Sequence, residues 1–243
     1  MIKIENTDVY GFEAAIRGMR NPWNSWEKSD SVMCEGADGF EDCTTHAAKS
    51  CPRYGDFSHD IFCVGKADYE LMKKLVSLGS VHGKFMRMIN VTVDITAPMY
   101  WWKEFDTYKV GTVRNSCSTM HTITAKAFTF DDFSHEHLTD DGLCVLENII
   151  EALNDARDAY FEYDMSSETL QAGLTKEIIW WQIIQLLPSS YNQRATVQLN
   201  YAVLCNIYHS RKNHPLDEWQ DFCRWIESLP YSELIVGGNA DEM

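Results

Sequence analysis

The sequence is short of positive charge and has no long apolar run, and each absence excludes a class of protein. Lys and Arg total 21 against 36 Asp and Glu, a formal charge of −15. Because such a field repels polyanions, we expect neither a nucleic-acid polymer nor an anionic membrane as a partner. The most apolar run, residues 178–187, has about half of the roughly 20 residues that a bilayer crossing requires. We therefore predict a buried helix there.

The eight cysteines also lack the spacing of a zinc site. Four of them lie between residues 34 and 63 beside two histidines, but no two are separated by the roughly two to four residues of a zinc knuckle. Free thiols are the expectation and a structural metal is the alternative, so we predict no metal ligands. The N-terminus has no apolar signal segment, which leads us to expect a cytoplasmic protein.

No repeat or low-complexity tract divides the chain, and 243 residues can bury a core of their own. We predict one domain over residues 1–236. It contains an irregular excursion at 21–58, rich in Gly, Asp, Ser and Cys, and an acidic tail follows at 237–243.

Hydrophobic spacing indicates both strands and helices, so the expected fold class is α/β (α+β) with a central sheet flanked by helices. Period-two alternation over 88–95 predicts a strand buried on one face, and Pro98 is then suited to begin a helix over 99–108. A first strand is expected at 3–9. The remaining expected helices cover residues 12–19, 67–78, 142–162, 175–187, 198–208 and 216–229.

Within Val91–His121 the chain passes from a strand through Ala97-Pro98 into a helix. This passage resembles the segment that carries the Arg-His-Arg-x-x-Ser signature of the flavin-dependent thymidylate synthases, the thymidylate-synthase-complementing family. His82 lies before this strand, as a family histidine does. After Leu187-Pro188 the chain also matches the spacing Arg-x5-Asn-x5-Asn-x4-Arg. The matching positions are Arg194, Asn200, Asn206 and Arg211.

The resemblance implies a homotetramer with active sites at subunit contacts. It implies reductive methylation of dUMP to dTMP, with FAD as cofactor, NADPH as reductant and methylenetetrahydrofolate as carbon donor. The implied FAD contacts are His82, Lys109, Arg194, Asn200 and Asn206. The implied dUMP contacts are Glu104, Arg114, Ser118 and Arg211, of which Ser118 and Arg211 are the implied catalytic residues.

The residues themselves support a nucleotide site. If one helix carries both Asn200 and Arg211, they lie about three turns and ~16 Å apart on nearly the same face. A guanidinium holds a phosphate or a carbonyl with a planar fork, and an amide both donates and accepts. Lys109 and Arg114 form a local positive cluster in an acidic chain, which suggests an anion site, although a solvated helix end explains them almost as well.

Alternatives remain because the family's Arg-His-Arg is replaced here by Thr107-Tyr108-Lys109. Lysine is a point charge without the guanidinium fork, so flavin contacts would differ. One alternative is a nucleotide- or flavin-binding relative without thymidylate synthase activity, and another is an oligomeric scaffold. Trp101 and Trp102 are expected in the core or at a subunit interface.

Overall fold

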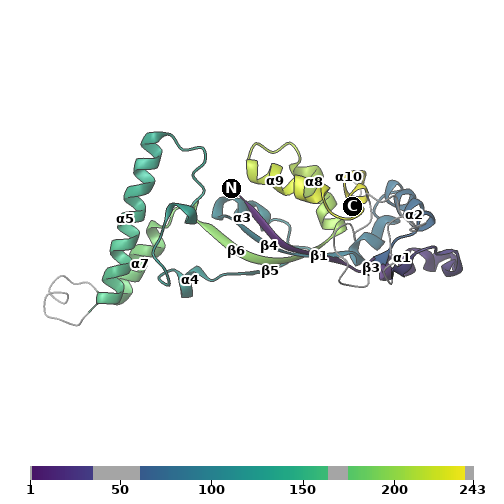
Figure 1. Ribbon diagram of the computed structural model, residues 1–243, viewed down its shortest axis with the longest axis horizontal. Helices are drawn as coiled ribbons and strands as arrows, with labels where there is room; N and C mark the ends of the chain where they lie inside the picture. Colours follow the sequence, from purple (N-terminus) through teal and green to yellow (C-terminus); the bar gives the residue numbers. More distant parts are fainter. Residues whose placement is uncertain (1, 35–60, 164–174, 239–243) are drawn as a thin grey trace. The chain divides into compact units, whose positions relative to one another are not determined.

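The protein has a mixed α/β fold in which helices flank a four-stranded sheet, as expected from the sequence (Figure 1). The computed structural model describes residues 2–34, 61–163 and 175–238. The large sheet has the strand order β1-β4-β6-β5, and β2 and β3 form a separate antiparallel pair. The strands are β1 (Lys3–Tyr10), β2 (Val32–Cys34), β3 (Ile61–Cys63), β4 (Asn90–Pro98), β5 (Val113–Ser116) and β6 (Asn192–Asn200).

Helices account for most of the other regular structure in the described residues. The α-helices are α1 (Phe12–Arg20), α2 (Lys66–Ser77), α3 (Met99–Phe105), α4 (Thr119–Thr122), α5 (Asp140–Glu162), α7 (Lys176–Leu186), α8 (Tyr201–Arg211), α9 (Asp217–Glu227) and α10 (Glu233–Val236). The 3₁₀ turns are η1 (Asn21–Trp23), η2 (Trp26–Lys28), η4 (Gly83–Met88) and η5 (Phe130–Asp132). None of these helices is both long enough and apolar enough to span a membrane.

Alternation of apolar and polar residues explains the two inner strands. On β4, Val91, Val93, Ile95 and Ala97 are buried while their neighbours are half-exposed. On β6 the buried positions are Ala195, Val197 and Leu199. Because side chains of a strand point alternately to its two faces, one face of each strand packs into the core.

Three predicted boundaries are wrong. The helix expected over 198–208 begins only at Tyr201, because residues 192–200 form β6. Asn200 is therefore the N-cap of α8 and not a mid-helix asparagine. Strand β4 runs to Pro98, beyond the strand end expected at residue 95. The helix expected from residue 99 does begin there, with Pro98 as its N-cap, but it stops at Phe105, three residues earlier than expected.

Contacts divide the chain into two compact units. The first unit comprises Met1–Lys3, Ile95–Thr107 and Asn115–Thr196, and the second comprises Ile4–Asp94, Tyr108–Arg114 and Val197–Met243. Strands β4 and β6 each contribute residues to both units. The predicted single domain over 1–236 stays a prediction.

In the first unit the aromatic side chains of α3 form a core. Trp101 and Phe105 stack with their ring centroids 5.0 Å apart, and both are fully buried. The indole of Trp102 donates to the carbonyl of Gln193 at 2.9 Å. The prediction that Trp101 and Trp102 lie in the core or at an interface is therefore resolved in favour of the core.

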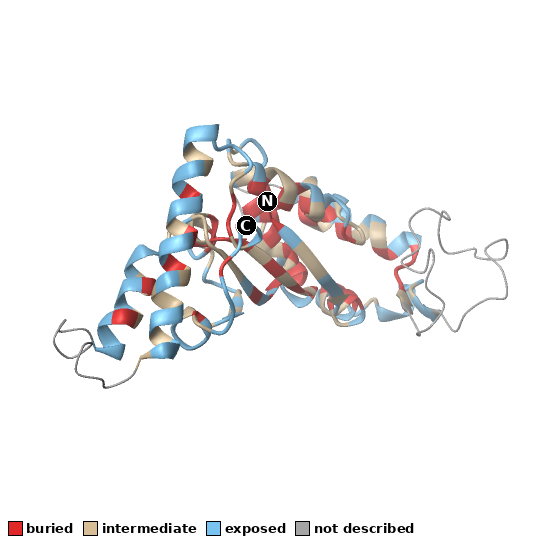
Figure 2. Ribbon diagram, turned by 60° about the vertical axis from the view of Figure 1, so that its left-hand side comes forward, coloured by how far each residue is buried: buried red, intermediate tan, exposed pale blue. Residues whose placement is uncertain are grey.

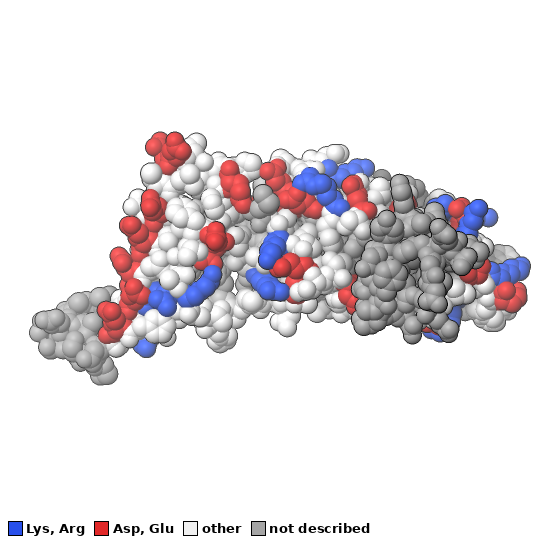
Figure 3. Space-filling model, in the orientation of Figure 1, with Lys and Arg blue, Asp and Glu red and all other residues white. Residues whose placement is uncertain are grey.

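The helix pair α5 and α7 holds a second apolar cluster of the first unit. Leu146, Ile150 and Leu153 are the buried residues of α5, whereas Val145 is exposed. Helix α7, predicted to be buried, buries only Ile179 and Ile183 (Figure 2). The outward face of α5 carries a row of acidic side chains (Figure 3), namely Asp140, Asp141, Glu147, Glu151, Asp155, Asp158 and Glu162.

In the second unit a buried ion pair holds the first residues of the predicted irregular segment 21–58 in place. Asp68 on α2 is fully buried and accepts hydrogen bonds from Arg20 Nε and from the hydroxyls of Ser29 and Ser31, each at 2.6 Å. Arg20 also donates to the carbonyl of Lys28 at 3.0 Å. Residues 21–34 are thus tied to α1 and α2, while residues 35–58, with Cys43 and Cys51, lie outside the described residues.

These bonds determine the protonation of Asp68. Burial alone would raise the pKa of its carboxyl group. The hydrogen bonds from Ser29, Ser31 and Arg20, together with the charge of Arg20, outweigh burial and hold the pKa below its usual value. The carboxylate is therefore charged at neutral pH.

Candidate functional site

The residues predicted to form the site fall into two sets, one in each unit. Glu104, Ser118 and Arg194 belong to the first unit. The second unit contains the other six, namely His82, Lys109, Arg114, Asn200, Asn206 and Arg211.

Arg194 lines a cavity of about 320 Å³ in the first unit. Lining residues come from the ends of β4 and β5, from α4 and from the beginning of β6. They include Thr96, Cys117, Thr119, Lys126, Phe128, Asp132, Tyr191, Asn192 and Gln193. The volume lies at the lower end of the ~300–1,000 Å³ range of small-molecule sites.

Backbone pairing between residues 117 and 193–194 builds one wall of this cavity. The amide of Cys117 donates to the carbonyl of Arg194 at 2.9 Å, and Gln193 Nε2 donates to the carbonyl of Cys117 at 2.8 Å. Ser118 follows as the N-cap residue of α4, and its carbonyl accepts from the hydroxyl of Thr122 at 2.7 Å. Ser118 thus lies between two lining residues, Cys117 and Thr119.

The lining of the cavity includes both cationic side chains and a hydrogen-bond acceptor. The Arg194 side chain is exposed at its wall, and Lys126 forms an ion pair with Asp132. Asn192 Oδ1 is a buried acceptor that has no hydrogen-bond partner among the described residues. Because a buried polar atom without a partner costs about 1–3 kcal/mol, this oxygen favours a ligand that donates to it.

Aromatic rings supply the apolar part of the same cavity. Phe128 and Tyr191 lie with their ring centroids 6.3 Å apart in an edge-to-face arrangement. Burial, with the nearby Asp132 and Cys117, raises the pKa of the Tyr191 phenol. The hydroxyl therefore keeps its proton at neutral pH and can donate a hydrogen bond.

Glu104 is not among the residues that line this cavity. It lies half-buried on α3, where its backbone carbonyl accepts from the hydroxyl of Thr107 at 2.8 Å. The structure therefore brings Arg194 and the Ser118 segment to one cavity and leaves the predicted substrate contact at Glu104 without support.

In the second unit, residues 108–112 pack along α8. A Cβ added at Gly111, whose φ is 77°, would lie 3.1 Å from Asn200 Nδ2 and 3.1 Å from a methyl group of Val203. Asn200 Oδ1 caps α8 by accepting from the amide of Val203 at 3.1 Å. This close approach explains why glycine occupies position 111. A residue with a side chain would be strained at this positive φ, and its Cβ would lie too close to Asn200 and Val203.

Arg211, at the other end of α8, is held by two aromatic residues. Its Nε donates to the hydroxyl of Tyr108 at 2.9 Å. Its guanidinium carbon lies 4.7 Å from the ring centroid of Trp219, which is fully buried, and 5.6 Å from that of Tyr108. Tyr108 occupies the middle position of the segment that corresponds to Arg-His-Arg, so this replacement contacts Arg211 directly.

The remaining predicted residues of the second unit have simple placements. Lys109 is exposed in the turn that the Thr112 amide closes, and Arg114 lies half-buried on β5. Asn206 is exposed on α8 and accepts from the hydroxyl of Ser210 at 3.4 Å. His82 is exposed, directly before η4. The prediction that one helix carries both Asn200 and Arg211 is wrong, because Asn200 is the last residue of β6 and only caps α8, whereas Arg211 is the last residue of α8.

Several residues that shape these two arrangements were not predicted from the sequence. Asn192, Tyr191 and Lys126 line the cavity, and the alternation of residues 195–199 was a signal for the strand that carries Asn192. Tyr108 and Trp219 hold Arg211, but no spacing rule links two residues so far apart in the chain.

Comparison with known proteins identifies the fold. No protein-family model and no curated protein sequence matches the chain. A solved structure of thymidylate synthase ThyX from Helicobacter pylori, with FAD and dUMP, is 15% identical and covers 96% of each chain with a TM-score of 0.58. The UMP/dUMP methylase PolB from Streptomyces cacaoi, bound to 5-Br dUMP, is 13% identical and covers 100% of this chain and 97% of its own, with a TM-score of 0.53.

These likenesses extend over nearly the whole chain, so the protein has the fold of flavin-dependent thymidylate synthases and of this methylase. The fold predicted from the resemblance is thereby confirmed. At 13–15% identity the likeness concerns the fold alone, because one fold supports many activities.

Proposed function

We propose that the protein binds a uridine-type mononucleotide, dUMP or a close relative, in the Arg194 cavity and methylates its pyrimidine ring. The single observation that carries this proposal is the cavity, in which an exposed guanidinium and an unpartnered buried amide oxygen lie among aromatic side chains. The shared fold with two uridylate-binding methylating proteins supports the same chemistry.

Each part of such a nucleotide has a suitable partner in the cavity. Arg194 offers a planar fork for a phosphate. Asn192 Oδ1 can accept from the N3–H of a uracil, a proton that a cytosine lacks. The Tyr191 hydroxyl can donate to a ring carbonyl, and Phe128 provides an apolar surface for the base. Donation to the carbonyl also stabilises negative charge that develops on the ring during methylation.

The residues of the second unit suit an FAD cofactor, which we include in the proposal. Beside Gly111, Asn200 Nδ2 and the buried hydroxyl of Thr112 have no hydrogen-bond partner in the described part of the chain. Lys109 is exposed in the same turn. Lys109, Asn200 and Asn206 would hold the cofactor, and the fork of Arg211, fixed by Tyr108 and Trp219, would bind a phosphate or carbonyl group. Bound and reduced, the flavin supplies a hydride; NADPH and methylenetetrahydrofolate are the proposed co-substrates.

A specific observation favours a second candidate, a nucleotide-binding relative without redox chemistry. Thr107 and Tyr108 replace two cationic side chains of the family signature, and the Tyr108 hydroxyl instead engages Arg211. This candidate shares the nucleotide cavity and differs only in lacking flavin binding.

The proposed homotetramer draws support from α7, which exposes Ile178, Trp181 and Leu186. An oligomeric scaffold without ligands is the third candidate. Trp101 and Trp102 are buried in the core, so the exposed residues of α7 are better suited to test assembly.

Two measurements separate these candidates. We expect dUMP to bind in a calorimetric titration, and purified protein supplied with FAD to retain an oxidised-flavin spectrum after desalting. Growth of a thymidine-requiring strain that lacks its own synthase would establish the complete activity. Binding of dUMP without FAD would select the second candidate, and binding of neither would refute the proposed function.

A further inference from the structure

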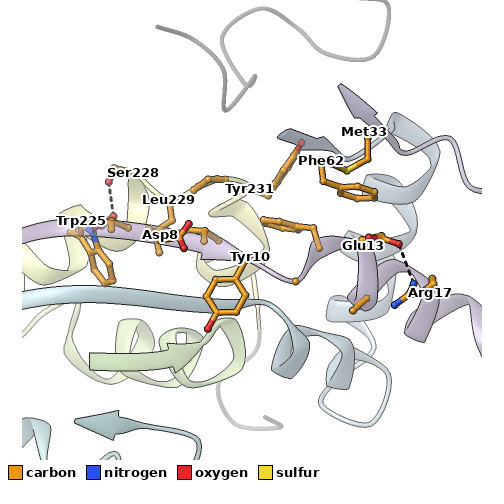
Figure 4. A pocket seen from close by; sticks show the side chains of 16 residues that line it. Asp8, Tyr10, Glu13, Arg17, Met33, Phe62, Trp225, Ser228, Leu229 and Tyr231 are labelled. Carbon is orange, nitrogen blue, oxygen red and sulfur yellow. Dashed lines mark hydrogen bonds and ion pairs between the residues drawn. The ribbon is translucent and has the colours of Figure 1, made fainter. Parts of the chain in front are cut away.

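The second unit contains a larger cleft that none of the predicted site residues lines. Its volume is about 830 Å³. Asp8 and Tyr10 project into it from β1, and Phe12 comes from the beginning of α1 (Figure 4). The opposite wall comes from residues 225–231, and Met33 of β2 and Phe62 of β3 close one end.

Five of the sixteen lining residues are aromatic. Tyr10, Phe12, Phe62, Trp225 and Tyr231 all line the cleft. The rings of Phe12 and Tyr231 meet edge to face with centroids 5.2 Å apart. Ring faces carry partial negative charge, so a concave group of rings attracts cations that fit among them.

Most polar groups of the cleft are already bonded, and Asp8 is the exception. The Trp225 indole donates to the Thr7 hydroxyl at 3.0 Å, and the Tyr10 hydroxyl accepts from Gln198 Nε2 at 3.0 Å. Glu13 pairs with Arg17 at 3.1 Å. No hydrogen bond or ion pair within the described residues engages the Asp8 carboxylate, so the lining carries an uncompensated negative charge.

Two residues at this cleft have a positive φ. Gly11 has φ 98°, and a Cβ there would lie 2.1 Å from the carbonyl oxygen of Met88. Tyr231 has φ 54° although it is not glycine, and its hydroxyl accepts from the amide of Val64 at 3.3 Å. A strained non-glycine residue persists only where its surroundings enforce it, and such residues gather at ligand sites.

We propose that this cleft binds an organic cation, an alkylammonium group with an apolar body, whose charge faces Asp8 and whose substituents contact the aromatic rings. An anion would meet the uncompensated carboxylate and the negative ring faces. A neutral apolar ligand would leave Asp8 to be desolvated without a partner. The site shares no lining residue with the Arg194 cavity, so the inference goes beyond the proposed function and does not depend on it.

The test is a calorimetric titration of the full-length protein with benzyltrimethylammonium. Phenylmethanesulfonate, of similar shape and opposite charge, is the counter-probe. Asp8→Asn removes the charge at nearly constant shape, and Glu27→Gln is the matched control because Glu27 is an exposed acid outside the cleft. Circular dichroism confirms that each variant is folded. Trp225→Leu is a second variant that removes one ring and keeps the carboxylate.

We expect saturable binding of the cation, weakened about tenfold or more by Asp8→Asn, about fivefold by Trp225→Leu and not at all by Glu27→Gln. The sulfonate should not bind. Absence of saturable cation binding, equal binding by folded Asp8→Asn, or equal binding of the sulfonate would each overturn the proposal. Because dUMP is absent from this titration, failure here leaves the proposed function unaffected.

Discussion

The polar side chains described above are bonded differently in the two units. In the second unit, charged and amide groups bond to one another: Arg20 pairs with Asp68, Asn200 caps α8, and Arg211 is held by Tyr108. In the first unit, the Arg194 cavity retains an amide oxygen at Asn192 without a partner. The amide oxygen of Asn200 therefore stabilises the fold of the second unit, whereas the amide oxygen of Asn192 is available to a ligand in the first.

The largest expected effect is on the stability of the second unit. Asp68→Asn should lower the free energy of unfolding by about 3–5 kcal/mol, because it leaves the buried guanidinium of Arg20 without its counter-ion. Denaturant unfolding measures this loss. Asp158→Asn, at an exposed acid of α5, is the control and should change little.

The same carboxylate predicts acid sensitivity. The folded pKa of Asp68 is below the ordinary value, so its contribution is complete above the unfolded pKa and is lost as the pH falls through the folded one. Asp68→Asn should therefore flatten the acid limb of the stability curve below about pH 4. An unchanged acid limb would show that Asp68 does not determine it.

In the first unit the expected effect is on affinity. Arg194→Ala should weaken dUMP binding by about 2–4 kcal/mol, since it removes a charged partner of the phosphate. Its unfolding free energy should change by less than about 0.5 kcal/mol because the side chain is exposed. Arg87→Ala, another exposed arginine, is the control in the same titration. Equal affinity in both variants would remove Arg194 from the site.

Arg211→Ala should affect both the stability of the protein and its affinity for a ligand. We expect a stability loss of about 1–3 kcal/mol from the hydrogen bond to Tyr108 and the contact with Trp219. A loss of about 2–4 kcal/mol in dUMP affinity is expected if Arg211 binds substrate. Tyr108→Phe separates them, since it removes only the hydroxyl. Thermal unfolding unaffected by Arg211→Ala would contradict a structural role.

The smallest expected effect concerns Asn192. Asn192→Ala should weaken dUMP binding by about 1–2 kcal/mol through loss of one acceptor. It should not lower stability, because Asn192 Oδ1 has no bond to lose within the described chain. A stability loss with unchanged affinity would make Asn192 a structural residue.

The sequence predicts the features that depend on neighbouring residues, and it does not predict those that depend on contacts between distant segments. Strand β4 and helices α1, α2 and α9 follow from periodicity, which needs only neighbouring residues. The spacing of Asn200 and Arg211 suggested one helix for both, but Asn200 belongs to β6 and only caps α8, which depends on where β6 ends. Burial of α7 was wrong because an all-apolar helix does not reveal which of its faces another element covers.

The site was predictable only in part for the same reason. Arg194 was named from its resemblance to a family position, as an implied FAD contact, whereas one wall of the cavity beside it is built by the pairing of Cys117 with residues 193–194. Such contacts between distant segments leave no pattern in a single sequence. The partnership of Tyr108 with Arg211 is another contact of this kind.

The most direct test of the account is the response of the Asn192 and Gln193 side-chain amide signals, in a ¹⁵N-resolved NMR spectrum, to added dUMP. The account predicts saturable shifts of both signals that disappear in Arg194→Ala and persist in Arg87→Ala. Saturable binding of dUMP that leaves both amide signals unmoved would contradict the assignment of the nucleotide to this cavity.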